Sequence, residues 1–223
     1  MASAKAILGA VAGRFIFRHG KVTTVERLSE HFTRIDVQGK ELEGAPFSPG
    51  DKVQIFLPDI GMRTYTPVTW EADRTWFIGY THGEGPGSKW VRDIKQSDEV
   101  AMFGPRRSID VSDVNGPLVV IGDETSVAVA VSLTRARIDR QVVVALEATS
   151  PDETREVARR LELTRVTVTP RGQLNEVVAA QLALGATPVF TGRAATIQAL
   201  KQQLKPRGGK TKAYWAEGKR GLD

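Results

Sequence analysis

The 223-residue sequence contains no cysteine, and this absence removes several kinds of chemistry at once. Without cysteine the chain cannot form a disulfide, hold a cysteine-ligated zinc or iron–sulfur site, or use a catalytic thiol. Histidine is nearly as scarce: His19, His31 and His82 are the whole set, and they share no metal-site spacing, so we predict no metal site. Any redox chemistry would therefore depend on an organic cofactor.

Long apolar runs are also missing. Nothing in the sequence approaches the ~18 uninterrupted apolar residues of a membrane-spanning helix, and the apolar pair Ile7-Leu8 is too weak for a secretory signal. We therefore expect a cytoplasmic protein without a membrane span. Lys and Arg number 31 against 26 Asp and Glu, a net charge of +5. This mild excess suits an anionic ligand such as a nucleotide, or solubility alone, and does not indicate nucleic acid.

The first half of the chain has the pattern of short β-strands. Apolar residues roughly alternate with polar ones, and glycine and proline separate the runs. Strands are expected at 22–25, 32–37, 52–57, 75–80 and 99–103. Many short strands with such turns predict a small antiparallel β-barrel or sandwich, with one helix over 88–94.

After Gly116-Pro117 the pattern changes to strands that alternate with helices. Strands are expected at 118–121, 141–146, 166–168 and 188–190, and helices at 125–137, 151–161, 174–184 and 194–204. This alternation predicts a Rossmann-like parallel sheet with helices on both faces. We predict two domains, 15–112 and 113–223, the second ending in a basic tail. The active site is expected in the cleft between them, beyond the carboxyl ends of the parallel strands.

The segment Arg63-Thr64-Tyr65-Thr66-Pro67 lies near a predicted strand and carries recognisable chemistry. Arg63 offers a planar fork for a phosphate, and the strand period of two places Tyr65 on the same face. One surface would then hold a phosphate and stack a ring on a flat heterocycle. An ordinary surface strand is the alternative.

A glycine-rich turn follows the strand that ends near residue 80 and leads into a short helix; it runs from His82 to Trp90. Backbone N–H groups at a helix start form an anion site where glycines allow close approach. Ser88 can cap that helix or touch a phosphate. A plain loop is the alternative, but together with Arg63 the turn indicates the pyrophosphate of a dinucleotide.

These motifs resemble those of the siderophore-interacting proteins, the ferric-siderophore reductase branch of the ferredoxin-reductase-like flavoproteins. The matching segments are Arg63-Thr64-Tyr65-Thr66, the run from His82 to Trp90, Gly104-Pro105-Arg106, Gly122-Asp123-Glu124-Thr125-Ser126 and Tyr214-Trp215. They occur in the family's order from about residue 20 to the end of the chain. The resemblance implies a two-domain FAD enzyme that passes electrons from NAD(P)H to a ferric siderophore.

The resemblance also implies roles for individual residues. Arg63 and the turn 83–88 would hold the FAD pyrophosphate, while Tyr65 would pack on the isoalloxazine and Thr66 would hydrogen-bond near its N5, so that these two are the catalytic residues. His82 would contact the ribityl or adenine portion, or be structural. The implied cofactor-binding residues are Arg63, Thr64, Tyr65, Thr66, His82, Gly83, Gly85, Pro86, Gly87, Ser88, Trp90, Gly122, Asp123, Glu124, Thr125, Gly192 and Arg193.

The choice between NADPH and NADH stays open. Asp123 and Glu124 would either reach the nicotinamide or ribose or only cap the following helix, which Thr125 can also cap. Glu147 would suit a ribose 2′-hydroxyl and disfavour NADPH. Against that, Arg171 and Arg193 follow the next two strands and favour a 2′-phosphate, so NADPH is slightly preferred.

Other acceptors and other functions compete with the siderophore interpretation. A quinone, a haem or an electron-carrier protein is the alternative acceptor. A non-catalytic module that binds an anionic chelate or nucleic acid is the second alternative, although the aromatic residues fall mostly at core-like positions. The basic tail, 205–220, would attract an anionic ferric chelate or be simply solvated. Trp215 would pack over the flavin region or anchor the tail to the barrel, and we favour the anchor.

Overall fold

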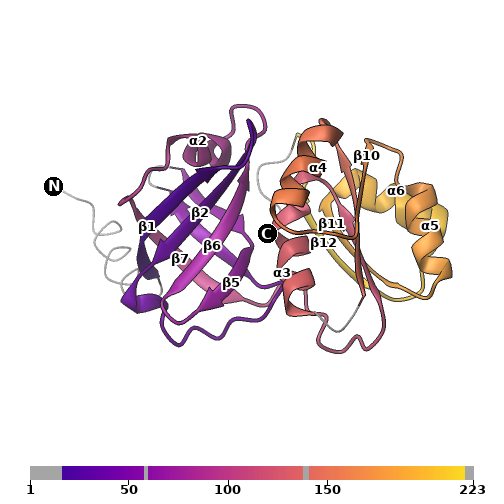
Figure 1. Ribbon diagram of the computed structural model, residues 1–223, viewed down its shortest axis with the longest axis horizontal. Helices are drawn as coiled ribbons and strands as arrows, with labels where there is room; N and C mark the ends of the chain where they lie inside the picture. The colour runs from indigo at the N-terminus through magenta and orange to yellow at the C-terminus, as the bar shows by residue number, and fades with distance from the viewer. Residues whose placement is uncertain (1–16, 58–59, 138–140, 219–223) are drawn as a thin grey trace.

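The computed structural model describes residues 17–57, 60–137 and 141–218. The first half of the chain forms a barrel, and the second half forms a parallel sheet covered by helices, with the two lying side by side (Figure 1). No helix in the described ranges is long and apolar enough to cross a membrane.

The first half is a seven-stranded antiparallel sheet with the strand order β4-β3-β7-β1-β2-β6-β5. Its strands are β1 (Arg18–Arg27), β2 (Phe32–Gln38), β3 (Lys52–Leu57), β4 (Gly61–Tyr65), β5 (Pro67–Glu71), β6 (Arg74–Tyr80) and β7 (Glu99–Arg106), with the short helices η1 (Lys40–Leu42) and α2 (Pro86–Asp93) between them. Alternate residues of the strands fill the interior, where Ile35, Val53 and Phe77 have no exposed surface. The predicted antiparallel barrel is confirmed, although the sequence pattern does not predict β5.

Helix α2 is fixed closely to the barrel. A Cβ at Gly79 on β6 would lie only 2.5 Å from Cγ2 of Val91, so the missing side chain lets the helix approach the strand. The guanidinium of Arg27 donates to the carbonyls of Val91 and Arg92 near the end of the helix, at 2.9 and 2.6 Å. These contacts fix the direction in which the start of α2 points.

The second half is a five-stranded parallel sheet with the order β10-β9-β8-β11-β12. It contains β8 (Leu118–Gly122), η2 (Glu124–Ser126), α3 (Val127–Ala136), β9 (Val142–Ala148), α4 (Pro151–Arg160), β10 (Val166–Pro170), α5 (Asn175–Ala183), β11 (Thr187–Arg193), α6 (Ala194–Leu204) and β12 (Lys210–Trp215). The Rossmann-like prediction is confirmed. The chain winds outward from β8 through β9 to β10 and then crosses back to β11, so the switch point lies between β8 and β11.

Part of the predicted basic tail is a strand. Lys210–Trp215 forms β12 at the edge of the sheet, parallel to β11. Lysines at alternate positions are typical of an exposed edge, and Lys210 pairs with Asp113 at 2.8 Å. The strand carries Tyr214 and Trp215 to the carboxyl edge of the sheet, beside the barrel.

The two halves share a core and a set of polar contacts. One apolar cluster joins Phe32, Val68 and Ile78 of the barrel to Val127 and Val131 of α3. This shared core holds the two halves together along α3.

The first turn of α4 adds polar contacts to the barrel. Glu153 accepts hydrogen bonds from Ser29 Oγ at 2.7 Å and from the backbone N–H of His31 at 2.9 Å. Burial alone would raise the pKa of Glu153, but the hydrogen bonds from Ser29 and His31 outweigh it and hold the pKa below its ordinary value of 4.5. Stability from this group is therefore present above the unfolded-state pKa and is lost as the pH falls through the lowered pKa.

The variant Glu153→Gln tests that linkage. At pH 7 we expect it to lower the free energy of unfolding by about 1.5–3 kcal/mol, because hydrogen bonds to an ionised group are lost. The difference from wild type should shrink as the pH falls below the ordinary carboxyl range. Urea denaturation at several pH values measures it, and a difference that does not change with pH would contradict the assignment.

Candidate functional site

The two segments singled out in the barrel lie against each other. Arg63 and Tyr65 project from one face of β4, and Gly87 lies in the first turn of α2. A Cβ at Gly87 would be 3.4 Å from the Tyr65 hydroxyl and 3.9 Å from Cγ and Cδ of Arg63. Thr64 lies on the opposite face of β4. The structure therefore brings Arg63, Tyr65 and the start of α2 together, and leaves Thr64 apart.

Tyr65 is held rigidly by other aromatic rings. Its ring centroid lies 5.1 Å from that of Trp90 and 6.4 Å from that of Phe77. The hydroxyl donates to the Gly87 carbonyl at 3.5 Å, and burial raises the pKa of the phenol, which stays protonated. Trp90 of α2 and Phe77 of β6 thus support Tyr65.

Arg63 is available for an anion. Its guanidinium donates to the Met62 carbonyl at 2.7 Å, and no carboxylate in the described ranges pairs with it. Beside it, the N–H groups of Gly87 and Ser88 belong to the first turn of α2 and have no partner in the helix's own hydrogen-bond ladder. A cationic fork and free backbone donors are the components of a phosphate site.

The turn before α2 is closed by Ser88, in a way the sequence does not predict. Its buried hydroxyl accepts from the His82 N–H and donates to the His82 carbonyl, both at 2.9 Å. Gly85 is the N-cap, Pro86 follows it, and no side chain caps the helix. Of the two roles that the sequence allows for Ser88, capping α2 or touching a phosphate, the structure therefore contradicts the first. Gly83 has a φ of +59°, the left-handed conformation that a turn of this kind requires.

An aromatic column connects the barrel to β12. The ring of His82, which is exposed, stacks on Tyr80 with centroids 5.9 Å apart and lies 5.9 Å from the ring of Trp215. Next to it, Thr66 faces the hydroxyl of Tyr214, whose pKa burial raises. The expected anchoring of Trp215 to the barrel is only part of its role, because its indole N–H binds the second half.

That second contact is made by Asp123, at the end of β8. Its carboxylate accepts from Trp215 Nε1 at 2.7 Å and from the Thr125 N–H at 2.9 Å, with 1% of the residue exposed. Desolvation raises the pKa of Asp123 despite these donors. Asp123 and Ser126 form a reciprocal capping box around η2. Asp123 is therefore the residue that caps this helix, a role for which the sequence also allows Thr125.

Two glycines allow the ends of β8 and β11 to approach Asp123 and Ser126. A Cβ at Gly122 would lie 2.1 Å from the Ser126 hydroxyl, and one at Gly192 would lie 2.8 Å from the Asp123 carboxylate. Gly192 also has a φ of +86°. A larger residue at Gly192 would displace the buried carboxylate, and one at Gly122 would displace Ser126.

We expect Gly192→Ala to destabilise the protein by about 2 kcal/mol, since the left-handed backbone and the contact with Asp123 both oppose a side chain. Gly172→Ala is the matched control, because Gly172 also has positive φ, +78°, but nothing within 4 Å of its Cβ position. Thermal unfolding of the two variants measures the difference. Equal losses would show that the contact with Asp123 adds nothing.

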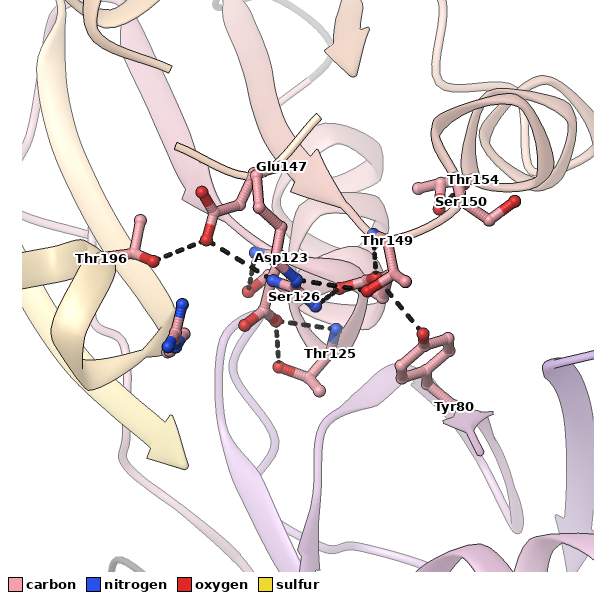
Figure 2. Close-up of polar contacts among 12 residues, drawn as sticks. Tyr80, Asp123, Thr125, Ser126, Glu147, Thr149, Ser150, Thr154 and Thr196 are labelled. Atoms are coloured by element: carbon pink, nitrogen blue, oxygen red, sulfur yellow. Dashed lines mark hydrogen bonds and ion pairs between the residues drawn. The ribbon is translucent and has the colours of Figure 1, made fainter. Parts of the chain in front are cut away.

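A buried ionic network lies beside Asp123 (Figure 2). Glu124 and Glu147 are 2% and 1% exposed, and Arg171 donates to both, at 2.7 and 3.5 Å. Tyr80 donates to Glu124 at 3.2 Å, so the network reaches the barrel, and Thr196 donates to Glu147 at 2.5 Å. Burial and Glu124 raise the pKa of Tyr80.

The contacts of this network bear on the three charged residues from which the sequence argues for NADPH or NADH, Glu147, Arg171 and Arg193. Glu147 also accepts from the Gly172 N–H at 2.8 Å, so it is engaged by protein donors and gives no support to a ribose contact. Arg171 neutralises buried carboxylates, and Arg193 forms an ion pair with Glu217. Arg171 and Arg193 are therefore both paired with carboxylates of this chain.

Comparison with solved structures identifies the architecture. A siderophore utilization protein from T. fusca aligns over 93% of this chain and 95% of its own, with 20% identity and a TM-score of 0.69. The siderophore-interacting protein from Aeromonas hydrophila aligns over 92% of this chain and 93% of its own, with 19% identity and a TM-score of 0.68. The fold is that of the siderophore-interacting proteins.

The same fold extends to more distant reductases. Phthalate dioxygenase reductase, described as a modular structure for electron transfer from pyridine nucleotides to a 2Fe–2S cluster, aligns over 90% of this chain and 68% of its own, with 14% identity and a TM-score of 0.72. No protein-family model matches the sequence, and no curated protein does. At these identities the similarity shows the fold, which agrees with the resemblance seen in the motifs.

Two residues of the site are not indicated by the sequence motifs. Tyr80 and Thr196 join it through contacts between distant segments. A signal does exist for Tyr80, which lies two positions before His82 at the end of a strand, and therefore shares its face. Nothing in the local sequence indicates Thr196.

Proposed function

We propose that this chain is a flavin-dependent reductase that binds FAD on the barrel, residues 15–112, and NADH or NADPH on the second half, residues 113–223. The observation that carries the proposal is the convergence of Arg63, Tyr65 and the N-terminal turn of α2 around Gly87. A cationic fork, backbone donors and a rigid ring face suit a pyrophosphate joined to a flat heterocycle.

The glycine-rich turn before α2 leaves room for FAD beside Arg63. Gly83 and Gly85 have nothing within 4 Å of their Cβ positions, and Gly87 leaves open the approach to Arg63, so no side chain from the turn fills this place. Arg63 and the N–H groups of Gly87 and Ser88 would hold the pyrophosphate. Tyr65, supported by Trp90, would orient the ring system, and Thr66 would hydrogen-bond its edge.

When bound, FAD supplies the conversion of a two-electron hydride into single electrons, which a ferric ion requires. The chain itself supplies binding and orientation. The nucleotide would bind at the switch point between β8 and β11, where ligands of open parallel sheets bind. The halves are held against each other by the shared apolar core along α3 and by the His82–Trp215 contact, so the two proposed sites would lie close together.

We propose a ferric siderophore as the substrate. Support comes from the shared fold with siderophore-interacting proteins and from the order of the five motifs along the chain. One nicotinamide nucleotide provides two electrons, so it reduces two ferric chelates, each gaining one electron. The iron(II) that forms binds more weakly to hard oxygen ligands and is released.

The test is an anaerobic assay of NADPH or NADH oxidation with different acceptors. Ferric catecholate and hydroxamate chelates are compared with a quinone, a haem protein and a ferredoxin, and a ferrous-specific dye follows iron release. We expect two ferrous ions per nucleotide with at least one chelate. Turnover with a quinone or protein carrier but with no chelate would assign the other acceptor class, and binding of chelate without turnover would favour the non-catalytic module.

A further inference from the structure

The indole of Trp215 lies where the two halves meet beside the proposed nucleotide site. Its ring is 5.9 Å from that of His82, and the guanidinium carbons of Arg171 and Arg193 are 5.9 and 5.7 Å from its centroid. Trp215 is paired in register with Arg193, the last residue of β11. The ring therefore stands at the carboxyl ends of the strands, next to the switch point.

Asp123 is arranged to fix that indole. A buried carboxylate is costly unless donors surround it, and Trp215 Nε1, at 2.7 Å, supplies a donor from outside η2. Gly192 leaves space for the Asp123 carboxylate because it has no side chain: a Cβ at Gly192 would lie 2.8 Å from that carboxylate. The acidic residue thus faces the tryptophan, and its oxygens are occupied by protein donors.

We infer that Asp123 is a positioning residue, whose hydrogen bond fixes Trp215 as one wall of the nicotinamide-nucleotide site. This inference rests on the proposed function and changes one part of it. The sequence leaves two roles open for Asp123, direct contact with the nicotinamide or ribose and capping of the following helix alone, whereas the inferred role acts through the indole. The wall so formed is flanked by two arginines, Arg171 and Arg193, and its other edge contacts His82 of the barrel.

Two variants change the same hydrogen bond from opposite ends, one by weakening its acceptor and the other by removing its donor. Asp123→Asn removes the charge of the acceptor, and Trp215→Phe keeps an aromatic ring but removes the donor. Each is expected to raise KM for the nucleotide about tenfold, with kcat and FAD content within about twofold of wild type. The double variant should be no worse than either single one, because only one contact is lost. Additive effects, or an unchanged KM in Trp215→Phe, would overturn the inference.

A matched control uses another indole. Trp70 Nε1 donates to the Leu42 carbonyl at 2.9 Å within the barrel, so Trp70→Phe loses an indole hydrogen bond of similar length away from the site. Its KM for the nucleotide should equal that of wild type. A rise equal to that of Trp215→Phe would show that any lost indole bond has this effect, and would contradict a positioning role.

Indole N–H resonances provide a readout that needs no turnover. The chain has four tryptophans, and Trp215→Phe identifies the resonance of Trp215. Asp123→Asn should shift this resonance and speed its solvent exchange, with the Trp70 signal unchanged. A shift without a change in KM overturns the inference while the reductase proposal stands. A wild-type protein that oxidises no nucleotide contradicts the proposed function itself, and the inference with it.

Discussion

Replacing Arg171 with alanine is expected to lower the free energy of unfolding by about 3–5 kcal/mol, because two buried carboxylates lose their common cation. Glu124 and Glu147 are 2% and 1% exposed, and Arg171 reaches both. The remaining donors, which include Tyr80 and Thr196, are neutral and do not balance the charge. Urea denaturation followed by circular dichroism measures the loss.

Two comparisons make that prediction specific. Arg159→Ala removes an arginine that is 74% exposed and paired with Glu156, so it should change stability little. Arg171→Lys keeps the charge but cannot fork between two carboxylates, and should recover only part of the loss. If Arg171→Ala and Arg159→Ala were equally stable, the network would not be the ionic centre that its geometry describes.

Replacing Arg63 with alanine is expected to raise the Kd for FAD about ten- to a hundredfold, since hydrogen bonds between a guanidinium and a phosphate are charge-assisted. The backbone donors of Gly87 and Ser88 would remain, so binding should weaken without being abolished. Stability without cofactor should change little, because the Arg63 guanidinium donates to the backbone carbonyl of Met62 and, among the residues that the structure describes, to no buried carboxylate. Titration of FAD into cofactor-free protein, followed by quenching of flavin fluorescence, gives the Kd.

The control for that titration is Arg74→Ala on β6. Arg74 is 71% exposed and lies 3.7 Å from Asp73, so its loss removes a positive charge from the barrel without touching the proposed site. Its Kd for FAD should match that of wild type. Equal weakening in both variants would show a general effect of charge, and retention of FAD by Arg63→Ala would remove Arg63 from the site.

The fold was largely accessible from the sequence because local patterns specify it. The alternation in 52–57 and the continuous apolar run 118–121 indicate a barrel strand and a strand buried on both faces. β12 was not predicted, because Lys210 and Lys212 make a short edge strand look like a charged tail. Its pairing depends on β11, which no local pattern shows.

The candidate site, like the fold, was predicted only where a local pattern indicates it. The pairing of Arg63 with the glycine-rich turn was predicted, because each carries a chemical signal of its own. The partners of the buried acids were not, since Asp123 meets Trp215 92 positions later and Glu124 meets Arg171 47 positions later. Contacts of such separation follow from the strand order, and motifs alone do not define them.

The most direct test of the account is the absorption spectrum of the freshly purified protein, recorded before and after anaerobic addition of NADPH or NADH. We predict a yellow protein with a flavin spectrum, which bleaches with at least one of the two nucleotides and recovers its colour when a ferric chelate is added. A colourless protein that also fails to bind added FAD would contradict the reductase proposal.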